Sequence, residues 1–278
     1  MTLPELPSPD GPRVGDLDLA DGTLLVRRDG ALATVILNRE AKLNATTRAM
    51  WRAIGEAFAR LSRDPGVRCI IVRGAGERAF SPGNDISEFE TDRANRQQAI
   101  DYGRDMHRTA AILDACPHPI VAQIHGICVG GGLEIASLAD VRVCGRASRF
   151  GAPIKNLGLV MAHAEMAPLI RLIGEADALA ILLEGRIIDA DEALRIGLVS
   201  RVVDDDQVAA EARATAGRIM AGAPLVARWH KRFARRLRDE RPLTEAEYLE
   251  AFDCFDTADF RTGYQAFLAK RTPDFRGE

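Results

Sequence analysis

The segment IHGICVGGGLEIASLADVRV, residues 124–143, decides the fold of this chain of 278 residues. The short apolar runs IVAQIHG (120–126) and VRVCG (141–145) are typical of buried strands. Between them, the consecutive glycines Gly130–Gly132 give way to a helix-forming pattern. The segment therefore predicts a strand, a glycine-rich turn, a short helix and a second strand in succession.

The same alternation extends toward the N-terminus. Residues 24–38, LLVRRDGALATVILN, contain two β-branched runs around Asp29-Gly30, which predicts a hairpin. Residues 46–61 repeat apolar side chains at helical spacing, and VRCIIVRG (67–74) reads as a strand buried on both faces. A polar helical stretch over residues 88–116 follows. These elements predict a mostly α/β body with crossover connections.

The two ends of the chain differ from this body. Four prolines among the first residues predict a loose leader over residues 1–22. From Asp189 onward helical patterns dominate, with few strands between them. We therefore divide the chain into the leader, an α/β core over residues 23–200 and a C-terminal helical region over residues 201–278.

Composition excludes several classes of protein. The formal net charge is −3, so the strong basic excess of a nucleic-acid-binding protein is absent. No apolar run approaches 18 residues, so no membrane span is expected. The five cysteines are odd in number and form no C-x-x-C pair, which argues against a disulfide scaffold or a metal site. We expect a protein of a reducing compartment, the cytoplasm.

Three consecutive glycines at the start of a helix require a reason, since glycine destabilises helices. One reason is close approach of the backbone to a ligand, whose negative charge the first helical N–H groups stabilise. Leu133 and Glu134 stand where a phosphate loop has Lys and Ser or Thr, and Ile135 stands where a dinucleotide fingerprint has glycine. Both phosphate motifs are disfavoured, and tight packing without any ligand is the competing explanation.

Glu134 is the candidate acid or base of this segment. Its neighbours are apolar, so burial should raise the pKa of its carboxyl toward neutrality. A capping or surface glutamate is the alternative interpretation. The loop AFSPGNDISEF, residues 79–89, is turn-like. If its backbone faces the glycine cluster, N–H groups from two loops could hold one oxygen, as in an oxyanion hole; otherwise it is a plain loop.

These segments together resemble the enoyl-CoA hydratase/isomerase, or crotonase, superfamily. Six of them occur in the order of that family: LNREAKLNA (37–45), AFSPGNDISEF (79–89), IHGICVGGGLEIASLADVRV (124–143), FGAPIKNLGL (150–159), LLEGRIIDADEALRIGLVSRVV (182–203) and AFLAKRTPDFRG (266–277). The resemblance implies a spiral of ββα units with a C-terminal helical oligomerisation region, assembled as a homotrimer or a dimer of trimers. It also implies an acyl-CoA substrate, with no cofactor besides the coenzyme A that the substrate carries.

The resemblance also assigns site residues. The backbone N–H groups of Asn84 and Gly131 would hold the thioester oxygen, and Glu134 matches the first of two catalytic glutamates in hydratases. Ala41, Lys42 and Leu43 would lie near the adenine, and Phe267 and Lys270 would reach coenzyme A, often across a subunit boundary. The remaining expected substrate or coenzyme A contacts are Ser81, Gly83, Asp85, Ile86, Gly130 and Ile154.

One departure from the family matters for the reaction. Ile154 stands where hydratases carry the second glutamate, and the following VMAHAEM (160–166) replaces the usual glycine-rich motif. His163 and Glu165 are candidate substitutes. Hydration or dehydration of an enoyl-CoA is the expected reaction. Isomerisation, retro-aldol cleavage and decarboxylation use the same enolate, and a coenzyme A-binding protein without hydratase activity is a further alternative.

The basic helix ARWHKRFARRLRD, residues 227–239, raises a separate possibility. Six Lys and Arg residues with two interleaved aromatics could contact RNA phosphates. The alternative is a solvated helix face with Trp229 and Phe233 packed inward. We favour the second interpretation and expect no nucleic-acid partner.

Overall fold

Two β-sheets form the body of the protein. The computed structural model describes residues 11–278. The larger sheet has the strand order β1-β2-β3-β4-β6-β8-β11, antiparallel through β3 and parallel from β3 onward. Its strands are β1 (Leu17–Leu19), β2 (Leu24–Asp29), β3 (Leu32–Leu37), β4 (Cys69–Gly74), β6 (Ile120–Ile124), β8 (Val141–Gly145) and β11 (Arg201–Val203).

The smaller sheet follows the larger one strand by strand. Its order is β10-β9-β7-β5, with β5, β7 and β9 parallel and β10 antiparallel to β9. These strands are β5 (Ala79–Ser81), β7 (Ile127–Val129), β9 (Arg149–Gly151) and β10 (Ile188–Asp189). Three times the chain crosses the larger sheet, then the smaller sheet, and then forms a helix. This confirms the predicted spiral of ββα units, and it confirms the hairpin at Asp29-Gly30.

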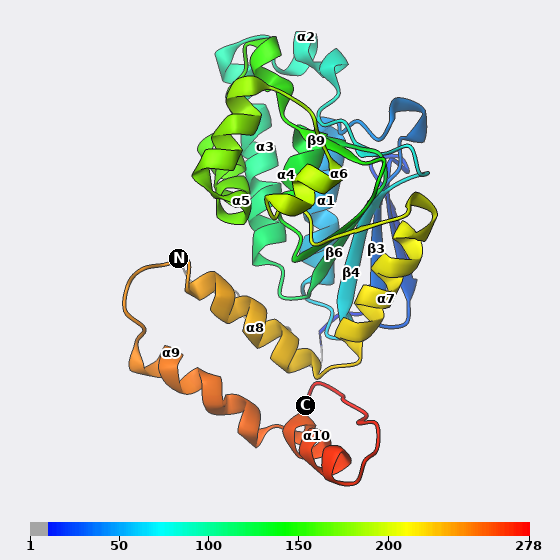
Figure 1. The fold of residues 1–278 in the computed structure, drawn as a ribbon, viewed down its shortest axis with the longest axis vertical. Helices are drawn as coiled ribbons and strands as arrows, with labels where there is room; N and C mark the ends of the chain where they lie inside the picture. The colour runs from blue at the N-terminus through cyan, green and yellow to red at the C-terminus, as the bar shows by residue number, and fades with distance from the viewer. Residues whose placement is uncertain (1–10) are drawn as a thin grey trace.

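Helices cover both faces of the sheets (Figure 1). The body contains α1 (Arg48–Leu61), α2 (Phe89–Asp92), α3 (Arg96–Ala115), α4 (Gly131–Ser137), α5 (His163–Glu184), α6 (Ala190–Arg195) and α7 (Val208–Met220). Single-turn 3-10 helices cover Glu40–Lys42, Ile86–Glu88, Pro153–Leu157 and Asp205–Gln207. The predicted helix over residues 88–116 is interrupted between α2 and α3, where the Asn95 side chain caps α3 by accepting from Gln98 N at 3.0 Å.

The central strands separate two apolar clusters, as the sequence of β4 predicts. Ile70 and Val72 face the main core, which includes Trp51, Phe58 and Phe80. Cys69 and Ile71 face the opposite side, where Val208, Ala212 and Ala216 of α7 cover the sheet. Because side chains alternate along a strand, a strand covered on both faces must be apolar throughout.

Two predicted boundaries are wrong. Residues 11–22 of the expected leader are structured, because Val14 N donates to Asp64 Oδ2 at 2.8 Å and β1 pairs with β2. Residues 1–10 of that leader lie outside the described residues. The expected core boundary at residue 200 falls too early, since β11 pairs with β8 and α7 packs on the sheet. The chain leaves the body only before α8.

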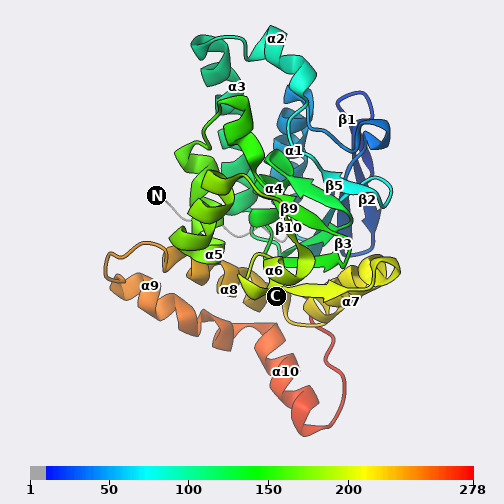
Figure 2. The same ribbon diagram turned by 45° about the horizontal axis from the view of Figure 1, so that its top comes forward.

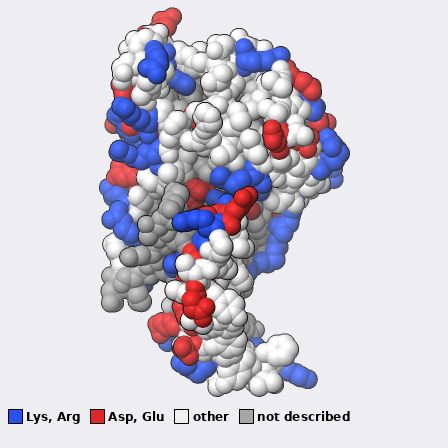
Figure 3. All heavy atoms as spheres, turned by 90° about the vertical axis from the view of Figure 1, so that its left-hand side faces the viewer, with Lys and Arg blue, Asp and Glu red and all other residues white. Residues whose placement is uncertain are grey.

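The C-terminal residues 224–278 form an arm under the body (Figures 1 and 2). The arm contains α8 (Pro224–Arg236), α9 (Glu245–Leu249), a 3-10 segment (Glu250–Asp256) and α10 (Ala258–Leu268). Acidic and basic side chains are interspersed where the body meets the arm (Figure 3). Large apolar side chains of the arm are exposed, among them Phe252, Phe255, Phe267 and Leu268.

The basic helix of the sequence is α8, and its cations bind the protein itself. Arg228, Lys231 and Arg235 donate to backbone carbonyls of the body, at Pro65, His118 and Cys116. The other three form ion pairs, Arg232 with Glu250, Arg236 with Glu247 and Arg238 with Asp114. The cluster of positive charge is therefore explained by attachment of the arm, while Trp229 and Phe233 are half-buried. Among residues 11–278, no helix is long and apolar enough to cross a membrane.

Candidate active site

Two loops meet at the carboxyl ends of β5 and β7. These strands are parallel neighbours, so the chain leaves both of them at the same edge of the smaller sheet. Asn84 follows β5, and Gly131 follows β7 as the first residue of α4. A Cβ atom added to Gly83 would lie 2.9 Å from Gly131 N, which shows how closely the two backbones approach. The structure thus brings together the two loops that the sequence singled out.

The glycines permit this approach. A Cβ atom at Gly132 would lie 2.3 Å from the carbonyl oxygen of Ser81, so only glycine fits there. Gly83 has a φ of +100°, a conformation that other residues rarely adopt. Tight packing therefore accounts for Gly132, as the competing interpretation of the glycine cluster expected. Gly131 differs from Gly132, because its backbone N–H group has no acceptor among the described residues.

The N–H groups of Asn84 and Gly131 have no acceptor among residues 11–278, although the amides around them do. Gly83 N donates to Ser81 Oγ at 3.1 Å, Asp85 N to Thr46 O at 3.0 Å and Gly130 N to Gly151 O at 2.9 Å. Buried backbone donors are nearly always paired, so two adjacent exceptions identify a place where an outside acceptor can bind.

The side chain of Asn84 fixes the first of these donors. Trp51 Nε1 donates to Asn84 Oδ1 at 2.7 Å, and Trp51 itself is buried in the core. The Asn84 side chain is thereby committed to the protein interior. Its backbone N–H remains available in the direction of the cavity described next.

A cavity of about 450 Å³ opens beside the two donors. Its walls include Gly83, Asn84, Gly130 and Gly131 together with three carboxyl residues, Asp85, Glu134 and Glu165. Apolar side chains complete it: Ile86, Phe89, Met106, Val129, Ile154, Leu157, Leu159 and Val160. A pocket that is mostly apolar with a few convergent polar groups is the usual form of a small-molecule site.

Glu134 lies on α4, within one turn of Gly131. Burial, and then the negative charge of Glu165, raise the pKa of its carboxyl to about 8, while the charge of Arg93 acts in the opposite direction. The sequence predicted a raised pKa from the apolar neighbours of Glu134, but it did not predict the contribution of a second carboxyl. Near neutral pH the pair holds a proton on Glu134, because two adjacent carboxyls resist ionising together.

Glu165 lies in the first turn of α5, and two hydrogen bonds fix its carboxyl group. Ala162 N donates to Oε2 at 3.0 Å, and His107 Nε2 lies 2.9 Å from Oε1. His107 comes from α3 and was not among the predicted residues. No local sequence signal could have identified it, because its contact depends on how α3 packs against α5.

The remaining predicted residues fall in three places. Gly83, Asp85, Ile86, Gly130 and Ile154 line the cavity. Ser81 is buried and does not line the cavity, and His163 is exposed and does not line it either. Ala41, Lys42 and Leu43 do not line the cavity, but they lie close to it in the chain. Thr46, three residues after Leu43, donates its N–H to the carbonyl oxygen of the cavity residue Gly83 at 2.8 Å. Phe267 and Lys270 lie on the arm, far from this cavity within the same chain (Figure 1).

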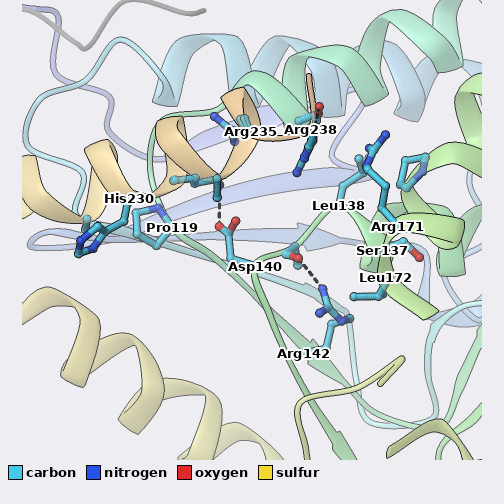
Figure 4. Close-up of a pocket in the computed structure, with 16 residues that line it drawn as sticks. Pro119, Ser137, Leu138, Asp140, Arg142, Arg171, Leu172, His230, Arg235 and Arg238 are labelled. Carbon is cyan, nitrogen blue, oxygen red and sulfur yellow. Dashed lines mark hydrogen bonds and ion pairs between the residues drawn. The ribbon is translucent and has the colours of Figure 1, made fainter. Parts of the chain in front are cut away.

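A larger cavity, about 640 Å³, lies between the body and the arm. It is lined by Arg235 of α8, by Arg238 two residues beyond the end of α8, and by Arg171 and Leu172 of α5 (Figure 4). Its charged groups are mostly occupied: Lys231 pairs with Asp140 at 2.6 Å and Arg238 with Asp114 at 2.7 Å. Size alone therefore does not identify the functional site.

The chain is similar to known proteins along most of its length. Residues 27–278 match the family described as enoyl-CoA hydratase/isomerase. A solved structure from Magnetospirillum magneticum, described as an enoyl-CoA hydratase/carnithine racemase, is similar with a TM-score of 0.92 and 49% identity over 94% of this chain and 98% of that one. The crotonyl-CoA hydratase of Syntrophomonas wolfei is 30% identical over 259 residues, 92% of this chain and 99% of the relative. The short-chain-enoyl-CoA hydratase of Clostridium acetobutylicum is 31% identical over 250 residues, 89% and 95% of the two chains.

Proposed function

Because the chain belongs to the enoyl-CoA hydratase/isomerase family, a family of enzymes, we propose that it adds water to a 2-enoyl-CoA thioester, or removes water in the reverse reaction. One observation carries this proposal. Among the described residues, Asn84 and Gly131 have backbone N–H groups without acceptors, and both line the same cavity as the carboxyl residues Glu134 and Glu165. Hydration requires these two elements, a site for the thioester oxygen and an acid–base pair.

The thioester oxygen binds the N–H groups of Asn84 and Gly131. When water attacks the β-carbon, electrons move onto this oxygen and an enolate forms. Donors that are already in place stabilise that charge without reorganising, and such stabilisation is worth about 3–4 kcal/mol per donor. The hydrogen bond from Trp51 to the Asn84 side chain keeps the first donor oriented.

Glu134 and Glu165 provide the acid and the base. Glu165, in its ionised form, takes the proton from water as oxygen bonds to the β-carbon. Glu134, which holds a proton because of its raised pKa, donates it to the α-carbon of the enolate. The proton then passes from Glu165 back to Glu134, which restores the starting state. Two carboxyls whose environments push their pKa values apart are the usual basis for such a division of roles.

Ile154 supports a second candidate function. It lines the cavity at the position where the resemblance expects a glutamate, and an apolar side chain there cannot transfer a proton. If Glu165 does not reach the substrate, a single carboxyl remains, and it can move one proton between carbons. Double-bond migration, decarboxylation or retro-aldol cleavage of an acyl-CoA would then be the reaction, or the protein would bind coenzyme A thioesters without turnover.

The proposal includes an assembly of several copies. Phe267 and Lys270 lie far from the cavity of their own chain, so any contact with coenzyme A needs the arm of another copy. The exposed aromatic side chains of the arm support a homotrimer or a dimer of trimers. Ala41, Lys42 and Leu43 remain the proposed adenine contacts. All five cysteines are free thiols, which supports a cytoplasmic location.

The test follows hydration of crotonyl-CoA and longer 2-enoyl-CoA thioesters by the loss of conjugated absorbance. We expect Glu134→Gln and Glu165→Gln each to lower kcat/KM by about 10²–10⁴, the usual effect of losing one proton-transfer group. Glu175→Gln is the matched control, because Glu175 is an exposed residue of α5 outside the cavity. Wild-type hydration by Glu165→Gln would exclude Glu165 as the second proton-transfer group.

A further inference from the structure

Arg93 is the only Lys or Arg on the cavity wall among the described residues. It lies in the turn between α2 and α3, and it is half-buried. Its guanidinium carbon lies 4.8 Å from the ring centroid of Phe89 and 4.8 Å from that of Tyr102. The Tyr102 ring is itself fixed, because its hydroxyl donates to Glu88 Oε2 at 3.0 Å. Two aromatic rings thus hold the cation in place at the cavity.

The donors of this guanidinium have no partner. Within residues 11–278 the structure records no hydrogen bond and no ion pair for the Arg93 side chain, although nearby arginines are paired. Arg39 pairs with Asp85 at 2.9 Å, and Arg48 with Asp105 at 2.7 Å. A guanidinium carries five N–H donors, and those of Arg93 are therefore available to an acceptor that enters the cavity. A ligand that supplies a carboxylate would satisfy them.

The position of Arg93 assigns it to the acyl end of the substrate. It shares the cavity wall with Glu134, and its charge acts on the Glu134 carboxyl, so it lies near the proposed proton donor. The segment expected near the adenine, Ala41–Leu43, is a different one. The cavity's own carboxyls leave Arg93 unoccupied: Asp85 is paired with Arg39, and Glu165 is bonded to His107.

We propose that the substrate of this enzyme is a 2-enoyl-CoA whose acyl group carries a carboxylate, and that Arg93 binds that carboxylate. This inference rests on the proposed function and names its substrate class. The planar fork of arginine matches both oxygens of a carboxylate, so it selects for the position of the charge as well as for its sign. An acyl chain of similar length that ends in a methyl group would leave the Arg93 donors unsatisfied.

The experiment compares pairs of short trans-2-enoyl-CoA thioesters of increasing length. Each length is offered once with a terminal carboxylate and once with a terminal methyl group. At the best length, we expect wild-type kcat/KM to favour the carboxylate by about 10- to 100-fold, the range of a charge-assisted hydrogen bond. The measured quantity is the ratio of the two kcat/KM values within each variant. A loss common to both substrates cancels in this ratio.

Arg93→Gln should reduce the ratio to about one, and Arg93→Lys should restore part of it, since lysine keeps the charge without the fork. Arg96→Gln is the control. Arg96 is an exposed residue at the start of α3, so this substitution removes the same charge outside the cavity. We expect its ratio to equal that of the wild type. A wild-type preference for the methyl substrate at every length, or an unchanged ratio in Arg93→Gln, would overturn the inference.

Failure of the proposed function would be seen separately. If neither substrate is turned over at any length, hydration is excluded, and calorimetric binding of the saturated thioesters still tests Arg93. A Kd about tenfold lower for the carboxylated thioester in the wild type, but not in Arg93→Gln, supports the inference. Equal Kd values for the two thioesters overturn it.

Discussion

The catalytic cavity and the cavity between body and arm are both lined by polar and charged groups, but they differ in how those groups are partnered. In the catalytic cavity, the N–H groups of Asn84 and Gly131 and the Arg93 side chain have no partner among the described residues. In the body–arm cavity, Lys231 pairs with Asp140 at 2.6 Å, and Arg142 donates to the carbonyl oxygen of Ala139 (Figure 4). The larger cavity is thus mostly a junction, although Arg171 has no partner among the described residues, and the smaller one is the proposed binding site.

The difference has a physical origin. A buried polar group without a partner destabilises the folded protein, so an unpartnered group on a cavity wall is a candidate for binding another molecule. A paired group in a cavity contributes to stability and needs no ligand. The comparison therefore predicts that changes in the catalytic cavity alter turnover, whereas changes at the junction alter stability.

The largest effect is expected where the two catalytic loops touch. In Gly132→Ala the new methyl group would lie 2.3 Å from the Ser81 carbonyl oxygen, which is backbone and cannot move aside alone. The loops must separate, and the Asn84 and Gly131 donors then no longer converge. We expect kcat/KM to fall by about 10²–10³ in the hydration assay, with a lower Tm.

Gly217→Ala provides the control for this variant. Gly217 lies in α7, where an added Cβ atom would meet nothing within 4 Å. Alanine favours a helix over glycine by up to about 1 kcal/mol, so we expect unchanged turnover and an equal or higher Tm. A kcat/KM equal to that of the wild type in Gly132→Ala would show that turnover does not depend on how closely the Asn84 and Gly131 donors approach.

A weaker effect, on stability alone, is expected at the junction. Lys231 is nearly buried. Lys231→Met removes both of its interactions, the ion pair with Asp140 and the hydrogen bond to the carbonyl oxygen of His118. Since Asp140 is partly exposed, we expect a loss of about 2–3 kcal/mol in the free energy of unfolding, below the range of a fully buried pair. Denaturant unfolding measures it, and kcat/KM per folded molecule should be unchanged.

The exposed pair of Arg146 and Asp204 sets the baseline for Lys231→Met. Its two side chains lie 2.8 Å apart on the surface, and such pairs contribute about 0–1 kcal/mol. Arg146→Met should therefore change stability little. A loss of turnover in folded Lys231→Met would contradict the comparison, because it would give the junction a part in catalysis.

The sequence predicts local features of the site and misses those that depend on packing. Glu134 follows the glycine cluster directly, so one segment predicts both its position and its raised pKa. Glu165, His107 and Arg93 belong to three separate elements, α5, α3 and the α2–α3 turn. Only the packing of these elements places Glu165 and Arg93 in the cavity and His107 against Glu165. The sequence offered Glu165 as one of two substitutes for a missing glutamate, and it gave no reason to prefer it over His163.

The same limit explains the errors in the fold. The strand pattern and the spiral order were predictable because apolar periodicity is local. The boundary at residue 200 was placed too early because β11 is only three residues long and its pairing with β8 leaves no periodic signal. The cations of α8 have the same pattern whether they face solvent, RNA or carbonyl groups. Only the structure shows that Arg228 and Arg235 bind backbone oxygens of the body.

The smallest effect is a pH-dependent change in stability caused by Glu134. The folded protein raises the pKa of this carboxyl from its ordinary 4.5 to about 8. Between these values the folded state keeps a proton that the unfolded state has lost, so the stability contributed by protonated Glu134 is complete below pH 4.5 and is lost as the pH rises through 8. Glutamine stays neutral throughout. We therefore expect Glu134→Gln to unfold with a higher free energy than the wild type at pH 8 and with an equal one near pH 4. The difference at pH 8 should fall well below the ~4 kcal/mol that the full pKa change allows, because Glu134 is partly exposed to solvent.

Denaturant unfolding at the two pH values tests this expectation, with Glu175→Gln as the exposed control that shows no pH-dependent difference. Because Glu165 contributes to the raised pKa, Glu165→Gln should reduce the stabilising effect of a second change, Glu134→Gln, at pH 8. The double variant would then be less stable than the sum of the two single changes predicts. Strict additivity would mean that the two carboxyls do not interact. The catalytic cavity would in that case hold two independent acids rather than a pair that shares one proton.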